Sequence, residues 1–239
     1  MMRLDKYLVS MQVGSRSEIK DFCKKGLITV NGAVCKQSDT KIDEDKDEIT
    51  FKGKVLSYEK YRYYMLHKPA GVVTATKDHH DKTVLDLLVG VNTKDLSPAG
   101  RLDKDTEGLL LLTNDGELIH NLLSPKKHVD KTYYIKARET LNPEDINALE
   151  NGVDIGEDTL TLPAKVTLLG EKEFLLTIHE GKFHQVKRML LAVNNEVLYL
   201  KRMSFGSLTL DENLAPGEFR ALREQEIKEL KMRKNNGFR

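Results

Sequence analysis

The sequence predicts an α+β protein with two domains, and three observations lead to this prediction. Its 239 residues suffice for a small domain followed by a medium-sized one. Short strand patterns are mixed with a few helix patterns, without the repeated strand–helix–strand units of a parallel sheet. Hydrophobic residues make up 39% and charged residues 31%, which is typical of a globular protein with a heavily charged surface.

Two amphipathic helices are expected at the start of the chain. Ser15 and Glu18 have the spacing of a capping box, in which each side chain binds the other residue's backbone N–H and so starts a helix. This second helix should end at Gly26, because glycine is favoured just beyond a helix C-terminus, and Cys23 should pack in the core. The preceding helix is predicted from four apolar residues at helical spacing: Leu4, Tyr7, Leu8 and Met11.

The opposite face of the second helix is cationic. Arg16, Lys20 and Lys24 follow one another at four-residue intervals, so they share that face, and Lys25 comes next. Residues 1–36 hold seven Lys or Arg against three acids, although the net charge of the whole chain is only +1. Such a patch fits docking onto phosphates, and it fits an ordinary solvated surface equally well.

Short strands should complete the first domain. Residues 27–34 predict a hairpin that turns at an Asn-Gly pair, and residues 47–51 predict a closing strand. Residues 52–60 begin with Lys-Gly-Lys and are expected to be a linker. The predicted domains are therefore residues 1–58 and residues 59–239.

The second domain should alternate short strands with helices. Strands are predicted over residues 63–66, 109–112, 131–137, 165–169 and 174–179. Helices are predicted over residues 83–88, 115–124, 142–151, 184–193 and 223–234. Residues 67–71 are expected to form a turn, with His67 as the polar residue that stabilises it.

An acidic residue precedes the most apolar strand of this domain. Gly100-Arg101-Leu102-Asp103 is followed, after two residues, by Thr-Glu-Gly, four leucines and Thr-Asn-Asp-Gly. The leucines indicate a buried strand, so the loop that carries Asp103 is anchored to a rigid element and can hold a reactive carboxylate in place. The same spacing also suits an ordinary turn that contains an aspartate.

Three segments in this order resemble the pseudouridine synthases: residues 100–116, Lys131-Thr132-Tyr133 and residues 180–189. They resemble in particular the branch of that family that modifies ribosomal RNA and carries an N-terminal RNA-binding module. The two N-terminal helices and the hairpin are similar to the RNA-binding domain of the ribosomal protein S4 type. The resemblance implies a mixed, mainly antiparallel sheet that is flanked by helices and divided by the active-site cleft.

The resemblance also implies an isomerisation that needs no cofactor. The bond from the ribose to the base nitrogen of a uridine breaks, the base turns, and it rejoins through ring carbon five, so every non-hydrogen atom is kept. An ionised carboxylate in a water-poor pocket is required, and a cation within about 4–6 Å keeps such a group charged. Asp103 would be this carboxylate, acting as a nucleophile or as a base. Lys187 has the position of the family's cation that pairs with it, and Arg188 is the alternative.

Further roles are implied for residues around the target nucleotide. Tyr133 would stack on the base, and Arg101 would fill the gap left by the flipped nucleotide or hold its phosphate. Contacts with RNA are implied for His184, Gln185 and Arg188 beside the cleft, and for Arg16, Lys20, Lys24 and Lys25 on the second helix.

Small-subunit (16S) ribosomal RNA is the implied substrate. The segment His-Gln-Val-Lys-Arg-Met and the short C-terminal tail resemble the members of the branch that act on it. The RNA would be met in a ribosomal particle, because the chain lacks base-reading motifs. Two alternatives stay open: a synthase that acts on large-subunit ribosomal RNA, and a non-catalytic RNA-binding factor for ribosome assembly.

Other classes of protein are not expected from this sequence. His79 and His80 lack a second set of ligands, so no metal is expected, and the two cysteines form no disulfide framework. No run approaches the roughly 18 apolar residues that a helix needs to cross a bilayer. With no sustained heptad pattern either, we expect a cytoplasmic monomer with no membrane partner.

Overall fold

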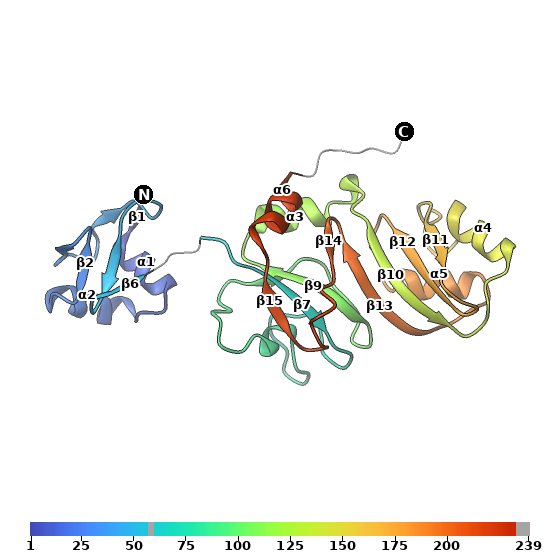
Figure 1. The fold of residues 1–239 in the computed structure, drawn as a ribbon, viewed down its shortest axis with the longest axis horizontal. Helices are drawn as coiled ribbons and strands as arrows, with labels where there is room; N and C mark the ends of the chain where they lie inside the picture. Colours follow the sequence, from blue (N-terminus) through green and yellow to red (C-terminus); the bar gives the residue numbers. More distant parts are fainter. Residues whose placement is uncertain (57–59, 233–239) are drawn as a thin grey trace. The chain divides into compact units, whose positions relative to one another are not determined.

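The computed structural model describes residues 1–56 and 60–232 (Figure 1). The chain divides into two compact units, Met1–Lys60 and Tyr61–Arg239, and each unit has hydrophobic core clusters of its own. The boundary predicted between residues 58 and 59 lies outside the described residues.

The first unit packs two helices against short antiparallel strands. Helix α1 spans Leu4–Ser10 and helix α2 spans Arg16–Lys24. One sheet has the strand order β3-β2-β5-β6, and a second pairs β1 with β4. The strands are β1 Met2–Arg3, β2 Ile28–Val30, β3 Ala33–Val34, β4 Lys41–Ile42, β5 Ile49–Phe51 and β6 Lys54–Leu56.

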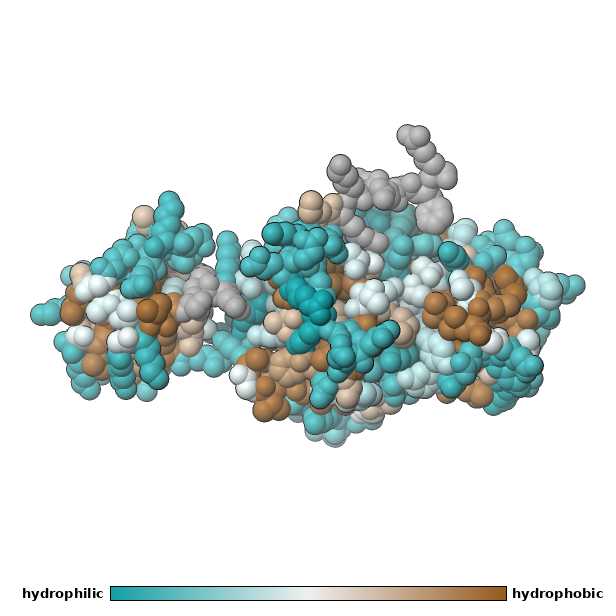
Figure 2. Space-filling model, in the orientation of Figure 1, coloured by the Kyte–Doolittle hydropathy of each residue, from teal (hydrophilic) through white to brown (hydrophobic). Residues whose placement is uncertain are grey.

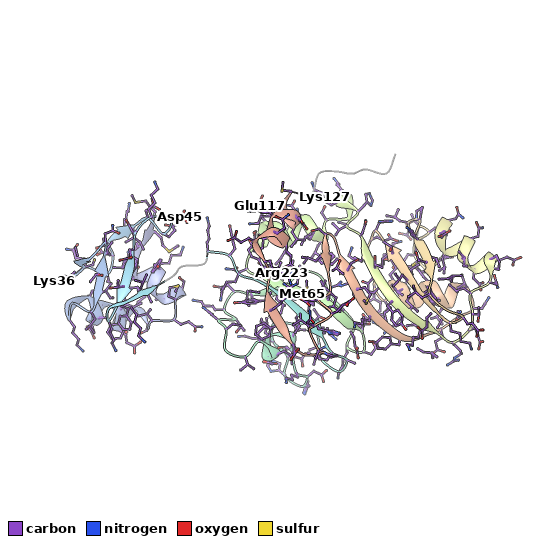
Figure 3. All side chains as sticks on the ribbon, in the orientation of Figure 1. Lys36, Asp45, Met65, Glu117, Lys127 and Arg223 are labelled. Atoms are coloured by element: carbon purple, nitrogen blue, oxygen red, sulfur yellow. The ribbon has the colours of Figure 1, made fainter. Side chains whose placement is uncertain are left out.

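The prediction for helix α2 is confirmed, including its start. The Ser15 hydroxyl accepts from the Glu18 N–H, and the Glu18 carboxylate accepts from the Ser15 N–H at 2.8 Å, which completes the capping box. Cys23 packs in the core as predicted. The core residues of this unit are Leu4, Tyr7, Leu8, Ile19, Cys23, Ile28, Ile42 and Ile49. At the surface, Lys36 and Asp45 are exposed (Figure 3).

The predicted linker is wrong over its first residues. Lys52 and Gly53 both have positive φ, 50° and 76°, and they form the turn of a hairpin. Lys54–Leu56 then pairs antiparallel with β5 as strand β6. Two successive residues with positive φ form the two-residue turn that fits the twist of a hairpin. A Lys-Gly pair in a sequence can therefore indicate either a linker or a hairpin turn. The rest of the predicted linker, residues 57–59, lies outside the described residues.

The second unit is built on a nine-stranded sheet with the central order β11-β12-β10-β13-β9-β7-β15, while β14 pairs with β13 and β8 with β9. Every strand pair in this order is antiparallel except β13 with β9, which confirms the prediction of a mixed, mainly antiparallel sheet. The strands are β7 Tyr63–Lys68, β8 Ser97–Pro98, β9 Glu107–Thr113, β10 Lys131–Ala137, β11 Lys165–Leu168, β12 Glu173–Ile178, β13 Val197–Phe205, β14 Leu208–Thr209 and β15 Phe219–Ala221.

Helices flank this sheet, as Figure 1 shows for α3 and α6 near β7 and β9 and for α4 and α5 near β11 and β12. Their bounds are α3 Gly116–Leu123, α4 Pro143–Asn151, α5 Gln185–Ala192 and α6 Glu224–Lys231, with short 3-10 turns at Val84–Leu87 and Pro125–Lys127. The predicted helix over residues 83–88 is thus a 3-10 turn. The last two residues of the final predicted helix, 233 and 234, lie outside the described residues.

The strand of four leucines is buried on both faces. Leu109 and Leu111 belong to a core cluster that also contains Met65, labelled in Figure 3. Leu110 and Leu112 belong to a different cluster, because successive side chains of a strand point to opposite faces of the sheet. Burial on both faces explains why this strand is a continuous apolar run without alternation.

Strand β13 departs from the prediction, which places no strand over residues 197–205. Lys201 and Arg202 interrupt its apolar pattern and give it the appearance of a surface segment. The strand nevertheless joins the two halves of the sheet by pairing with β10 on one side and β9 on the other. Gly108 permits the contact with β9: its φ is +107°, and a Cβ there would lie 2.3 Å from the carbonyl oxygen of Arg202.

The predicted turn over residues 67–71 is corrected in its first part. His67 and Lys68 end strand β7, and the turn follows at Ala70 and Gly71. His67 is buried, and its Nδ1 lies 2.7 Å from the carbonyl oxygen of Leu214. It therefore ties the strand to a distant loop and does not stabilise the turn.

In Figure 2, hydrophilic residues cover much of the visible face, with smaller apolar areas among them. Across residues 1–56 and 60–232, no helix combines the length and the apolar character that crossing a bilayer requires.

Candidate active site

The loop that carries Asp103 lies between strands β8 and β9 and is fixed by internal hydrogen bonds. Thr74 Oγ1 donates to the carbonyl oxygen of Leu102 at 2.7 Å and accepts from its N–H at 3.2 Å. The carbonyl oxygen of Asp103 in turn accepts from the N–H of Thr106 at 3.1 Å. The carboxylate is 28% exposed, so the fixed loop presents a reactive group to whatever fills the neighbouring space.

Lys68 holds the same loop from the protein interior. Its side chain is fully buried, and its Nζ donates to the carbonyl oxygens of Pro69, Lys104 and Thr106 at 3.0, 3.3 and 2.9 Å. Burial lowers the pKa of this lysine to about 8, although nearby acids, Asp105 first, oppose the shift. Lys68 therefore holds the backbone that follows Asp103, at Lys104 and Thr106.

Lys187, in the first turn of helix α5, provides the cation at this carboxylate. Its Nζ lies 3.2 Å from Asp103 Oδ2, and 2.7 and 2.8 Å from the two carboxylate oxygens of Asp105. Burial works to lower the pKa of Lys187, but hydrogen bonds to Asp105 and Asp103 outweigh it and the pKa is raised. The same hydrogen bond lowers the pKa of Asp105. His184 Nε2 is also near, at 3.5 Å from Asp103 Oδ1.

Arg188, the other candidate cation, points elsewhere. Its Nη1 pairs with Glu157 at 2.8 Å and donates to the carbonyl oxygen of Phe183 at 3.0 Å, while Nη2 donates to the carbonyl oxygen of Ile155. Of the two cations that the sequence leaves open, Lys187 is the one that the structure places against Asp103.

Gln185 is 4% exposed, and its amide is used within the protein. Its Nε2 donates to Glu180 Oε1 at 2.7 Å, and its Oε1 accepts from the N–H of Lys182 at 3.0 Å. These bonds brace the loop before α5. The next residue back, His184, has a left-handed φ of +46° and stacks on Phe183 with ring centroids 3.8 Å apart.

A cavity of about 830 Å³ opens beside Asp103. That volume is within the range of about 300–1,000 Å³ that holds small ligands. Its lining includes the predicted residues Arg101, Asp103, Tyr133, His184, Gln185 and Lys187. Tyr133 on strand β10 is 7% exposed, so its ring belongs to the core as well as to the cavity wall. Arg101 is exposed and makes no side-chain hydrogen bond or ion pair with the described residues.

Two further residues of the lining add an aromatic ring and a buried cation. Phe183 is 73% exposed at the cavity, and Arg202 of strand β13 is almost fully buried in its wall. A Phe next to the predicted His184 could have been included from the sequence as a potential stacking surface. Arg202 can be placed near the cleft from the sequence, but its burial cannot be predicted, because that burial depends on strand β13.

The four predicted cations of the first unit are exposed on or just after helix α2. Arg16, Lys20 and Lys24 point away from the core side of that helix, where Ile19 and Cys23 are buried, and Lys25 follows at the helix end. Within residues 1–56 and 60–232, no three His, Cys, Asp or Glu side chains gather to hold a metal ion.

Comparisons with known proteins identify the family to which this fold and cavity belong. The sequence pattern of the RNA pseudouridylate synthases matches residues 62–192, and that of the S4 domain matches residues 2–49. The chain therefore belongs to the RNA pseudouridylate synthase family. It is a pseudouridine synthase, an isomerase, with an S4 domain in its N-terminal unit.

Three relatives illustrate the similarity. An uncharacterized RNA pseudouridine synthase of Bacillus subtilis is 48% identical over 95% of this chain and 97% of its own length. The ribosomal small subunit pseudouridine synthase A of Vibrio cholerae is 43% identical over 95% of this chain and 98% of its own. A crystal structure of a pseudouridylate synthase has a TM-score of 0.69 and 37% identity, and the match covers 96% of this chain and 100% of that one.

Proposed function

We propose that this protein converts one uridine of small-subunit ribosomal RNA to pseudouridine without a cofactor, and that Asp103 is the reacting carboxylate. The observation that supports this most is the ion pair between Asp103 and Lys187, at 3.2 Å, in the wall of a cavity of nucleotide size. Relatives named for the small ribosomal subunit, such as the Vibrio cholerae enzyme, support the choice of target.

The reaction begins with extrusion of the uridine. A glycosidic bond within folded RNA is inaccessible to a side chain, so the nucleotide must leave its stack and enter the cavity. Tyr133 would stack on the extruded base, a contact worth about 1–3 kcal/mol. Arg101, which has no partner among the described residues, is available to occupy the vacated position in the RNA or to hold a phosphate.

Asp103 then acts on the ribose. Its carboxylate either adds to the sugar carbon as the bond from that carbon to the base nitrogen breaks, or removes a proton from the sugar, and both routes need the ionised form. After the base has turned, ring carbon five bonds to the sugar and gives up its hydrogen to the solvent, and the freed ring nitrogen takes up a proton. The ammonium of Lys187 lies 3.2 Å from Asp103 Oδ2 and is the cation that pairs with this carboxylate. We assign Gln185 and Arg188 to holding the loop before α5, because their polar groups are engaged inside the protein.

The S4 domain binds the surrounding RNA. Arg16, Lys20, Lys24 and Lys25 would contact phosphates, which positions the enzyme without reading sequence. Recognition of one particular uridine would then depend on the shape of a ribosomal particle. We also propose that the protein acts on this particle in the cytoplasm as a monomer, which sedimentation of the purified protein tests.

The deciding experiment compares two aspartate variants. Small-subunit particles that carry uridine labelled with tritium at ring carbon five are mixed with the wild type, Asp103→Asn or Asp105→Asn. Asp103→Asn is expected to release no tritium above background while its RNA affinity stays close to that of the wild type. Asp105→Asn removes the same charge from the more exposed partner of Lys187 and is expected to keep turnover.

Two results would contradict the proposal. Product formation by Asp103→Asn would remove Asp103 from the chemistry. Release of tritium from large-subunit particles alone would replace the small-subunit target.

A further inference from the structure

A buried arginine in the cavity wall has no role in the mechanism above. Arg202 on strand β13 is 1% exposed, and it lines the same cavity as Asp103. Its Nε donates to the carbonyl oxygen of Leu109 at 2.8 Å, and its guanidinium carbon lies 5.0 Å from the centre of the Phe205 ring. Its Nη2 atom is buried and has no hydrogen-bond partner in the described part of the chain.

This arrangement is costly in the free protein. A guanidinium taken out of water needs acceptors for its N–H groups and a nearby negative charge. Among residues 1–56 and 60–232, no carboxylate lies within ion-pair distance of Arg202. The other buried cation, Lys68 on strand β7, donates to three carbonyl oxygens. A buried donor without an acceptor in a native protein requires an explanation, and a ligand that supplies the missing acceptor is one.

The position of Arg202 indicates which part of a ligand it meets. In the register of the sheet, Arg202 is opposite Tyr133 on strand β10 and opposite Gly108 on strand β9. Side chains of directly opposite residues lie on the same face of a sheet, with their Cβ atoms about 4.5–5.5 Å apart. Since Tyr133 is proposed to cover the flat face of the target base, Arg202 lies beside that face, where the edge of the base would be.

We propose that Arg202 reads the edge of the target uracil, with Nη2 donating to a ring carbonyl oxygen. This inference rests on the proposed function, since it requires a uridine in the cavity. It makes Arg202 a binding residue that selects the base, in addition to the Asp103 and Lys187 pair that acts on the sugar.

The chemistry of the isomerisation suits a donor at this place. The two carbonyl oxygens of uracil are related by the axis through N3 and C6. Turning the base about that axis brings C5 to the sugar and exchanges the two oxygens, so the Arg202 donor meets an acceptor before and after the turn. Cytosine carries an amino group in place of one of these oxygens and would direct a donor at a donor in one of the two orientations.

Three variants test this role. Arg202→Met removes the donor, Arg202→Gln keeps an N–H donor without the charge, and Lys201→Met removes the neighbouring cation, which does not line the cavity. The rate of tritium release from labelled small-subunit particles and the thermal unfolding midpoint are measured for each. We expect Arg202→Met to lower kcat/KM by roughly 10- to 100-fold, as expected for loss of one charge-assisted hydrogen bond.

The controls separate base recognition from a structural role. Arg202→Gln should recover part of the missing activity, Lys201→Met should stay close to the wild type, and the Tm of Arg202→Met should remain within about 4 °C of the wild-type Tm. Wild-type activity of Arg202→Met overturns the inference. A larger fall in Tm together with an equally inactive Arg202→Gln also overturns it and makes Arg202 a structural residue.

Failure of the proposed function gives different experimental results from failure of the Arg202 assignment. In that case the wild type releases no tritium, or Asp103→Asn releases it. If the wild type is active, Asp103→Asn is inactive and Arg202→Met is fully active, only the assignment of Arg202 fails.

Discussion

Two lysines in different environments contact the Asp103 loop, which carries the proposed reacting carboxylate. Lys187 is partly exposed and shares its charge between Asp103 and Asp105, so it remains an ammonium that can attract the carboxylate. Lys68 is fully buried, and its hydrogen bonds go only to backbone oxygens. Lys187 thus sets the electrostatics at Asp103, whereas Lys68 sets the geometry of the loop.

The lowered pKa of Lys68 makes a prediction about stability. Burial lowers this pKa from 10.5 to about 8, so between these values the unfolded chain binds more protons than the folded protein. Stability therefore gains a contribution as pH rises through that window. Relative to Lys68→Met, which lacks the group, the wild type should gain roughly 2 kcal/mol between about pH 7 and about pH 10.

Urea unfolding of both proteins at several pH values measures this gain. Because every other titrating group is common to the two proteins, its effect cancels in the difference. Parallel curves of unfolding free energy against pH would show that Lys68 keeps its ordinary pKa.

The choice between Lys187 and Arg188 shows what residue patterns cannot predict. Both cations follow Gln-Val in the motif, and neither spacing nor charge distinguishes them. The structure distinguishes them because Glu157 and the carbonyl oxygen of Ile155 engage Arg188 from a distant loop. The motifs select Asp103, Tyr133 and Lys187 as site residues, but the tertiary fold was needed to show which of the two cations pairs with Asp103.

At the scale of elements, helices and strands that are specified by neighbouring residues are predicted correctly from the sequence, whereas a strand that depends on distant partners is not. The capping box at Ser15, the capped helix α4 and the apolar run of β9 all rest on neighbouring residues, and the structure confirms them. Strand β13 forms by pairing with β10 and β9, which are far away in the sequence. The buried Arg202 also interrupts its apolar pattern, so the sequence does not indicate a strand there. Such an exception to the hydrophobic pattern is expected where function requires a polar group in the core.

Helix α2 makes the prediction that belongs to this scale. Replacing Arg16, Lys20 and Lys24 together by Gln should weaken binding to small-subunit RNA and reduce the salt dependence of that binding. For every phosphate that the protein no longer neutralises, the slope of log affinity against log salt falls by about 0.7 to 0.9. Filter binding at several salt concentrations gives the slope.

A control variant that loses the same number of charges distinguishes a specific role of helix α2 from an effect of the total charge of the unit. Lys36→Gln, Lys41→Gln and Lys54→Gln remove three exposed positive charges from the same unit outside α2. Equal changes of slope in the two triple variants would mean that the RNA responds to the net charge of the unit and that the stripe on α2 has no special part.

At the scale of the whole molecule, the proposed function places RNA affinity in the first unit and the chemistry in the second. The second unit closes on itself: strand β15, near its C-terminal end, pairs with β7 at its start. The Tyr63 hydroxyl donates to Asp115 at 2.7 Å, and Lys231 of the last helix lies 3.2 Å from the same carboxylate. Its core clusters contain no residue of the first unit. A fragment of residues 61–239 should therefore fold alone.

This fragment is expected to keep the chemical step and lose affinity for the particle. Asp103, Lys187, Tyr133 and Arg202 all belong to it, so kcat should remain within about threefold of the full chain, whereas the absence of several phosphate-binding side chains should raise KM roughly 10- to 1,000-fold. Steady-state tritium release separates the two constants, and circular dichroism checks the fold. A folded fragment whose kcat collapses while KM stays unchanged would show that the S4 domain takes part in the reaction itself, because uniform binding energy affects KM and leaves kcat unchanged.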